Sequence, residues 1–297
     1  MNPIQELLET SSSPILLDGA MGTMLMEEGL TQGDPPEEWN ITHPEKVRKI
    51  HRAYIEAGSQ VILTNSFGGN RFRLQMHDLQ DRAEELNRAA ARNARAEADA
   101  APHTVAVAGS MGPTGSIFEP MGDLTFEEAR GAFAEQALGL ADGGVDLYWI
   151  ETMSDLQEVE AAIAGIRSVS DLPISATLSF DTHGHTMMGV SPTQALSALK
   201  ELNLILIGAN CGTGPKELQE AIQKMREADP DVHLVAKANA GIPQVVNGEI
   251  EYSGSPEVMA TYASEVRDIG ARLIGACCGS TPEHVRAMAE ALAQDAG

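Results

Sequence analysis

Eight short apolar segments alternate with amphipathic helical patterns along almost the whole of the 297-residue chain. Some of these segments are entirely apolar, as in Val61-Ile62-Leu63 and Leu204-Ile205-Leu206-Ile207. Such segments are typical of parallel strands that are buried on both faces. Eight strands alternating with helices over about 280 residues predict an α/β fold, a single-domain (β/α)8 TIM barrel covering residues 1–297. The predicted strands span residues 15–18, 60–65, 104–109, 146–151, 173–179, 204–210, 233–239 and 271–277.

Local sequence signals support helices between these strands. Thr125 and Glu128 have the spacing of a capping box, and Pro282 stands where the last helix should begin. The alternative fold is an open doubly wound sheet, which usually carries a Gly-x-Gly-x-x-Gly phosphate-binding motif after its first strand. Residues 18–23 read Asp-Gly-Ala-Met-Gly-Thr and lack this motif. The barrel is therefore the preferred prediction.

The charge of the chain limits the partners that it can bind. The net charge is −23 at pH 7, whereas nucleic acids and anionic membranes bind clusters of Lys and Arg. Residues 1–13 are polar and have no apolar core of a signal peptide, and no apolar run reaches the length of a membrane span. We expect a cytoplasmic protein that acts on small molecules. An oligomer is possible.

The three cysteines all lie at the ends of predicted strands. Cys211 ends the sixth strand, and Cys277 and Cys278 end the eighth, so a barrel would place them on one rim. Adjacent cysteines make a poor disulfide because the bond has strict geometry. Three thiolates with one open position are typical of a catalytic zinc site. The alternatives are ordinary buried cysteines and a metal at the loop pair His183 and His185.

Two carboxylates also end apolar strands, where an unpaired charge is costly. Asp18 follows the first strand and Glu151 the fourth. Near a zinc ion they would suit the ammonium group of an amino-acid substrate. Thr64 and the backbone N–H groups of the turn at Gly19 could take the carboxylate of such a substrate. The other reading is a local turn at Asp18 and a helix N-terminal charge at Glu151.

Taken together, these strand-end motifs resemble the zinc-dependent homocysteine S-methyltransferases. That family includes betaine–homocysteine methyltransferase and the homocysteine module of cobalamin-dependent methionine synthase. The resemblance covers nearly the whole chain, and Ala276 stands where the family usually has glycine. The matching motifs are residues 18–23, Thr64-Asn65-Ser66-Phe67-Gly68, Gly112-Pro113-Thr114-Gly115, Glu151-Thr152, residues 208–212, Asn239-Ala240-Gly241 and residues 275–279.

The resemblance implies a function and assigns residues to it. It implies an enzyme that binds homocysteine, activates its thiol as the fourth ligand of a zinc ion, and methylates it to methionine. It implies zinc on Cys211, Cys277 and Cys278, with these cysteines and Glu151 as the catalytic residues. The substrate-binding residues that it implies are Asp18, Gly19, Thr64, Asn65, Glu151 and Asn239.

The methyl donor is less constrained. A small onium compound is expected, such as glycine betaine, dimethylsulfoniopropionate or S-methylmethionine. Members of the family that use betaine surround its trimethylammonium group with aromatic rings, and Gly68 and Thr152 are not aromatic here. One alternative is the homocysteine-binding subunit of a corrinoid-dependent methionine synthase system, with a separate corrinoid protein as partner. Another is a non-catalytic zinc- or thiol-binding protein. The loop aromatics that could replace the missing rings are Phe67, Trp39, Phe118 and Phe180.

Overall fold

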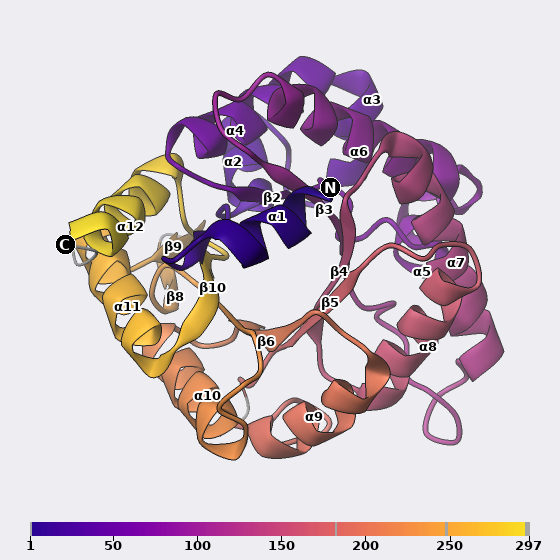
Figure 1. Ribbon diagram of the computed structural model, residues 1–297. Helices are drawn as coiled ribbons and strands as arrows, with labels where there is room; N and C mark the ends of the chain where they lie inside the picture. Colours follow the sequence, from indigo (N-terminus) through magenta and orange to yellow (C-terminus); the bar gives the residue numbers. More distant parts are fainter. Residues whose placement is uncertain (1, 182, 247–248, 295–297) are drawn as a thin grey trace.

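Eight parallel strands form a barrel in the computed structural model, which describes residues 2–181, 183–246 and 249–294 (Figure 1). The strands follow the order β1-β10-β7-β6-β5-β4-β3-β2, and a parallel bridge between Leu17 and Val61 joins the two ends. The predicted barrel and all eight strand positions are confirmed. The strands are β1 (Ile15–Leu16), β2 (Val61–Leu63), β3 (Ala106–Met111), β4 (Leu147–Met153), β5 (Ile174–Leu178), β6 (Leu206–Cys211), β7 (Leu234–Ala238) and β10 (Ala271–Ala276).

Helices surround the barrel and connect consecutive strands (Figure 1). The predicted capping box is present: Thr125 Oγ1 accepts from the Glu128 N–H, and the Glu128 side chain accepts from the Thr125 N–H. The helices are α1 (Pro3–Thr10), α2 (Met21–Glu27), α3 (Trp39–Thr42), α4 (Pro44–Glu56), α5 (Arg71–Leu74), α6 (Ala83–Asp99), α7 (Phe126–Gly143), α8 (Leu156–Arg167), α9 (Pro192–Leu199), α10 (Pro215–Ala228), α11 (Pro256–Ile269) and α12 (Pro282–Gln294), with short 3-10 turns at Pro36–Glu38, Gln75–His77, Gln80–Arg82 and Lys200–Leu202.

The inside of the barrel is packed with side chains from alternate strand positions. Leu17, Leu63 and Trp149 belong to this interior cluster, together with Val235 of β7. Successive side chains of a strand point to opposite faces, so every second residue of each strand faces inward. The remaining strand residues pack outward against the helices in a second, larger cluster.

Helix α1 covers one end of the barrel, and it crosses the centre of the view in Figure 1. Its residues Ile4 and Leu7 are buried and join the interior cluster. Asn2 caps the helix by accepting from the Ile4 N–H, and its amide donates to the Asp146 carbonyl. The barrel is therefore closed by apolar packing at this end and free for a binding site at the other.

A two-stranded hairpin follows β7 and was not predicted from the sequence. Its strands, β8 (Pro243–Val246) and β9 (Glu249–Tyr252), pair antiparallel. The hairpin ends at Tyr252, whose ring lies against Gly279 beside two of the cysteines. In the described part of the chain, no helix has both the length and the apolar character needed to cross a membrane.

Candidate metal centre and substrate cavity

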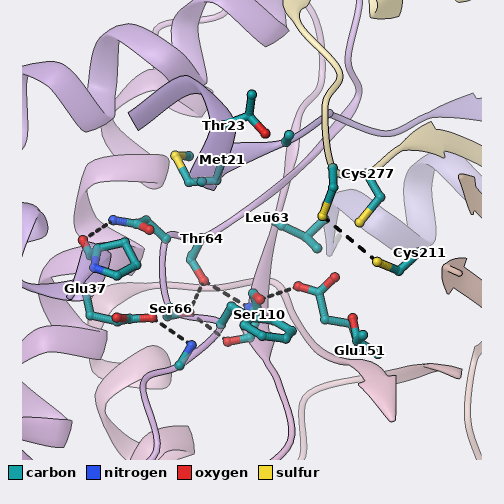
Figure 2. A pocket seen from close by; sticks show the side chains of 18 of the residues that line it. Met21, Thr23, Glu37, Leu63, Thr64, Ser66, Ser110, Glu151, Cys211 and Cys277 are labelled. Atoms are coloured by element: carbon teal, nitrogen blue, oxygen red, sulfur yellow. Dashed lines mark hydrogen bonds between the residues drawn. The ribbon is translucent and has the colours of Figure 1, made fainter. Parts of the chain in front are cut away.

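A cavity of about 500 Å³ opens at the C-terminal ends of the strands, opposite α1. This volume is in the range of small-molecule sites in proteins. Figure 2 shows the sulfur atoms of the cysteines on one side of the cavity and Glu37 on the other, with polar side chains between them. Eight of the residues expected in a site line it: Asp18, Gly19, Thr64, Asn65, Glu151, Cys211, Cys277 and Cys278.

The three cysteines converge at one edge of the cavity. Their sulfur atoms all lie within 4.8 Å of one another, and Cys211 Sγ is 4.0 Å from Cys278 Sγ. A tetrahedral zinc ion with Zn–S bonds of about 2.3 Å would hold two sulfurs about 3.8 Å apart. The hydrogen bonds that Cys211 makes with Cys277 and Cys278 raise its pKa, and the bond to Cys211 lowers the pKa of Cys278. The trio thus has the spacing and the donor atoms of a zinc site.

The turn after β10 directs Cys277 and Cys278 to the same side. Strand β10 ends at Ala276, so the alternation that would separate adjacent side chains has stopped before the two cysteines. Gly279 has a positive φ of 78°, and a Cβ there would lie 2.1 Å from the Tyr252 ring. Only glycine fits this position.

Cys211 reaches the trio through an unusual backbone conformation. Its φ is +62°, as is that of Thr152 on β4, two strands away, and such values are uncommon outside glycine. Asn210 joins the two strand ends: its Oδ1 accepts from the Thr152 N–H at 2.8 Å, and its Nδ2 donates to Thr152 Oγ1 at 2.7 Å. Strain of this kind persists where the surroundings hold it, often at functional sites.

Asn239 lies beside the cavity and is not among the residues that line it. Its Oδ1 accepts from the Cys278 N–H at 3.1 Å, and its Nδ2 donates to the Gly212 carbonyl at 2.7 Å. The side chain therefore joins the two cysteine-bearing turns. Its role in binding substrate stays a prediction.

The two predicted carboxylates lie at the floor of the cavity and are almost fully buried. Asp18 Oδ2 accepts from the Leu63 N–H at 2.7 Å, and the Ser110 hydroxyl donates to Glu151. Burial raises the pKa of both groups, and that of Glu151 reaches about 7. Lys237 opposes the shift in both cases.

Lys237 is a charged cavity residue that the sequence analysis did not single out. It is 4% exposed and lines the cavity, and its Nζ lies 3.2 Å from Asp18 Oδ1. Burial lowers its pKa, but the charges of Asp18 and Glu151 outweigh this effect and raise it. The sequence did contain a signal for this residue, because Lys237 is the single charged residue in the apolar run 233–239. It stands two positions after Val235, which faces the inside of the barrel.

A hydroxyl cluster connects the floor to the far side of the cavity (Figure 2). Thr64 Oγ1 lies 2.6 Å from Ser66 Oγ and accepts from the Ser110 N–H at 3.0 Å. At the turn after β1, a Cβ on Gly19 would lie 2.5 Å from Ser280 Oγ. The Ala20 N–H of that turn already donates to Ser280, so it is engaged within the protein.

The far side of the cavity carries the ring of Phe67 and the carboxylate of Glu37, together with the side chains of Arg73 and His77. Phe67 lines the cavity and is 37% exposed. Glu37 is buried, and its Oε1 accepts from the Gly68 N–H at 2.7 Å. The other three loop aromatics considered above, Trp39, Phe118 and Phe180, are buried and do not line this cavity.

The pair His183 and His185 lies on an exposed loop. Of the described residues, only the three cysteines form a group of three or more side chains with metal-ligand spacing. Among the described residues, His183 and His185 therefore have no third metal ligand beside them.

Comparison with known proteins identifies one family. A family model for homocysteine S-methyltransferase matches residues 15–292. Methionine synthases of Mycobacterium leprae (strain TN) and Mycobacterium tuberculosis (strain ATCC 25618 / H37Rv) are 34% and 35% identical to the chain over 305 residues. Each alignment covers 97% of this chain and 25% of the relative, so the chain spans about a quarter of the length of these proteins.

Solved structures show the same fold. The oxidized form of the homocysteine methyltransferase MmuM from Escherichia coli is 26% identical, with a TM-score of 0.81 over 98% of this chain and 99% of that chain. Its metallated form is 24% identical, with a TM-score of 0.81 over 97% of this chain and 99% of that chain. The chain thus aligns with nearly the whole of these two solved chains.

Proposed function

The chain belongs to the homocysteine S-methyltransferase family, and from this we propose that it methylates homocysteine to methionine with zinc as cofactor. The observation that carries the proposal is the cysteine trio, which shares one cavity with the carboxylates of Asp18 and Glu151. A thiol-binding edge and an ammonium-binding floor in the same cavity match the two ends of homocysteine. A reducing compartment such as the cytoplasm would keep the three thiols available.

A zinc ion on Cys211, Cys277 and Cys278 would supply Lewis-acid chemistry that favours the thiolate form of a bound thiol. The residues of the chain supply the positioning. Glu151 offers a buried acceptor toward which the substrate ammonium would turn, and Asp18 and the hydroxyl cluster at Thr64 line the same part of the cavity. In the transfer, the substrate sulfur bonds to the methyl carbon while the donor's bond to that carbon breaks. No side chain has to remove a proton in this step.

We propose that the donor is a small onium compound such as glycine betaine. The far side of the cavity supports this class, since Phe67 offers an aromatic ring and Glu37 a carboxylate. A quaternary ammonium or sulfonium group is attracted by both. Replacing Phe67 by Ala should therefore raise the KM for the onium donor and leave the KM for homocysteine nearly unchanged. A donor KM equal to that of the wild type would remove Phe67 from the donor site.

A corrinoid-dependent reaction is the second candidate. The methionine synthase relatives favour this candidate, because they are about four times as long as the aligned region and so contain further parts beyond it. In that case a corrinoid protein would deliver the methyl group to the same cavity. A non-catalytic zinc- or thiol-binding role is the third candidate, and specific binding of homocysteine would argue against it.

The deciding experiment measures methionine formation from homocysteine and glycine betaine with zinc-loaded protein and no cobalamin. Turnover would support the onium-dependent reaction. Binding of homocysteine without turnover, followed by turnover with a methylcorrinoid protein, would support the second candidate. Failure to bind homocysteine at all would overturn the proposed function.

A further inference from the structure

Lys237 carries a charged side chain inside the barrel, where burial of a charge is unfavourable unless another group compensates it. It follows Val235 by two residues in β7, so both side chains face the inside of the barrel. Its neighbours in the barrel pairing are Asn210 of β6 and Gly275 of β10. A buried ammonium is costly unless a carboxylate is close by.

Asp18 is that carboxylate. Lys237 Nζ and Asp18 Oδ1 lie 3.2 Å apart, with side chains only 5% and 3% exposed. The contact is a buried ion pair. The other oxygen, Oδ2, accepts from the Leu63 N–H. The charge of Asp18 is therefore already balanced by the protein.

Glu151 is in a different situation. Its carboxylate accepts from the Ser110 hydroxyl, which is neutral, and within the described residues it forms no ion pair shorter than 4 Å. Lys237 attracts it over a longer distance and favours its ionised form. The buried floor thus holds two carboxylates and one ammonium, which leaves one carboxylate in excess.

One excess carboxylate is the correct complement for one ammonium group. We propose that Lys237 is a specificity-determining residue. By balancing the charge of Asp18, it makes Glu151 the single acceptor for the substrate ammonium. The cavity then accepts a zwitterionic amino-acid thiol in preference to a purely cationic aminothiol. The proposal rests on the proposed function, because it assumes that a thiol is bound at the cysteine trio. Without Lys237 no cation would offset the two buried carboxyl groups, so the floor would attract cations more strongly and would no longer attract the carboxylate of the substrate.

The test compares three thiols with the same carbon chain up to the charged groups, which differ in the charged groups that they carry. Homocysteine carries an ammonium and a carboxylate, 3-aminopropane-1-thiol carries only the ammonium, and 4-mercaptobutanoate carries only the carboxylate. Their dissociation constants are measured by calorimetry on zinc-loaded wild-type protein and on the variants K237M, K237R and D18N. Zinc content and thermal midpoint are recorded for each variant.

The two charge-removing variants should shift selectivity in opposite directions. In K237M the preference for 3-aminopropane-1-thiol over 4-mercaptobutanoate should rise by about tenfold or more, because an unbalanced Asp18 attracts cations and repels anions. In D18N, where Lys237 is left without its partner, the preference should fall by about the same factor. K237R keeps the charge and should keep the selectivity. The double variant D18N/K237M again has one excess carboxylate and should return the ratio close to that of the wild type.

A purely structural ion pair would behave differently. It would weaken the binding of all three thiols alike in K237M and D18N, with no change in their ratio, and that result would overturn the proposal. If K237M does not fold, the opposite shift in D18N and the recovery in D18N/K237M still decide the matter. If wild-type protein binds none of the thiols, the proposed function itself falls, and this inference falls with it.

Discussion

At the scale of single residues, the cavity concentrates groups that are unfavourable without a partner. Three thiols lie within 4.8 Å of one another, and Asp18 and Glu151 are buried at the ends of apolar strands. Such groups persist when a cation or a hydrogen-bond donor compensates them. Each of these residues is therefore expected to affect binding or metal content more than it affects folding.

Cys278→Ser should remove zinc and abolish methyl transfer while the barrel remains folded. A serine hydroxyl is a poor substitute for a thiolate ligand, because structural and catalytic zinc sites use sulfur, imidazole or carboxylate. Metal content is measured by atomic spectroscopy and folding by circular dichroism. Cys211→Ser is the matched variant and should behave in the same way. A zinc-loaded and active Cys278→Ser protein would contradict the assignment of three ligands.

Glu151 should make homocysteine binding depend on pH. Burial raises its pKa to about 7, and it must be ionised to accept an ammonium group. Affinity should therefore weaken as the pH falls below 7, approaching about tenfold per pH unit. The thiol also titrates, so 4-mercaptobutanoate, which has no ammonium, serves as the reference ligand.

In Glu151→Gln this extra pH dependence should disappear, and the KM for homocysteine should rise strongly. The amide remains able to accept a hydrogen bond but carries no charge. Should the KM and the pH profile both match those of the wild type, Glu151 would not be part of the substrate site.

At the scale of the elements, the turns that follow β6 and β10 bring distant cysteines together. Cys211 and Cys278 are 67 residues apart in the chain, yet their sulfurs lie 4.0 Å apart. Asn239, at the end of β7, bonds to both turns. The metal centre thus depends on three neighbouring strand ends and not on one continuous motif.

Two glycines in these turns offer a matched comparison. Gly212 and Gly279 share a φ of 78°, but a Cβ on Gly212 would have open space, whereas one on Gly279 would meet the Tyr252 ring. Gly212→Ala should cost about 1–2 kcal/mol in the free energy of unfolding from backbone strain alone. Gly279→Ala should cost clearly more and weaken zinc binding, as measured by denaturation and by competition with a chelator.

Removal of the Tyr252 ring isolates the clash. In the double variant Gly279→Ala/Tyr252→Ala, the extra cost should largely disappear, because the ring that the new methyl group would meet is gone. Equal costs for the two single substitutions would show that the ring moves aside freely.

At the scale of the whole molecule, stability and chemistry are placed at opposite ends of the barrel. Helix α1 packs Ile4 and Leu7 into the interior at one end, and the cavity opens at the other. This division is general in (β/α)8 barrels. It allows the two properties to be changed separately.

Ile4→Ala should therefore lower stability without changing catalysis. Ile4 is fully buried, and truncation of such a side chain typically costs about 2–5 kcal/mol. The KM values for homocysteine and the donor should stay at the wild-type level well below the new melting temperature. Val258→Ala, at a position 46% exposed on α11, is the control and should change stability by less than about 0.5 kcal/mol. A rise in the homocysteine KM of Ile4→Ala would show that the two ends are coupled.

The sequence by itself determined the eight strands, their order and the cysteine trio. Apolar runs and helix caps are local patterns, and chemically distinctive residues at strand ends can be read without coordinates. Only the tertiary structure decided which residues share the cavity. Lys237 faces Asp18 because the pairing register of β7 turns it inward, and Phe67 alone among four loop aromatics lines the cavity. These outcomes depend on barrel closure and loop packing, which join residues far apart in the chain.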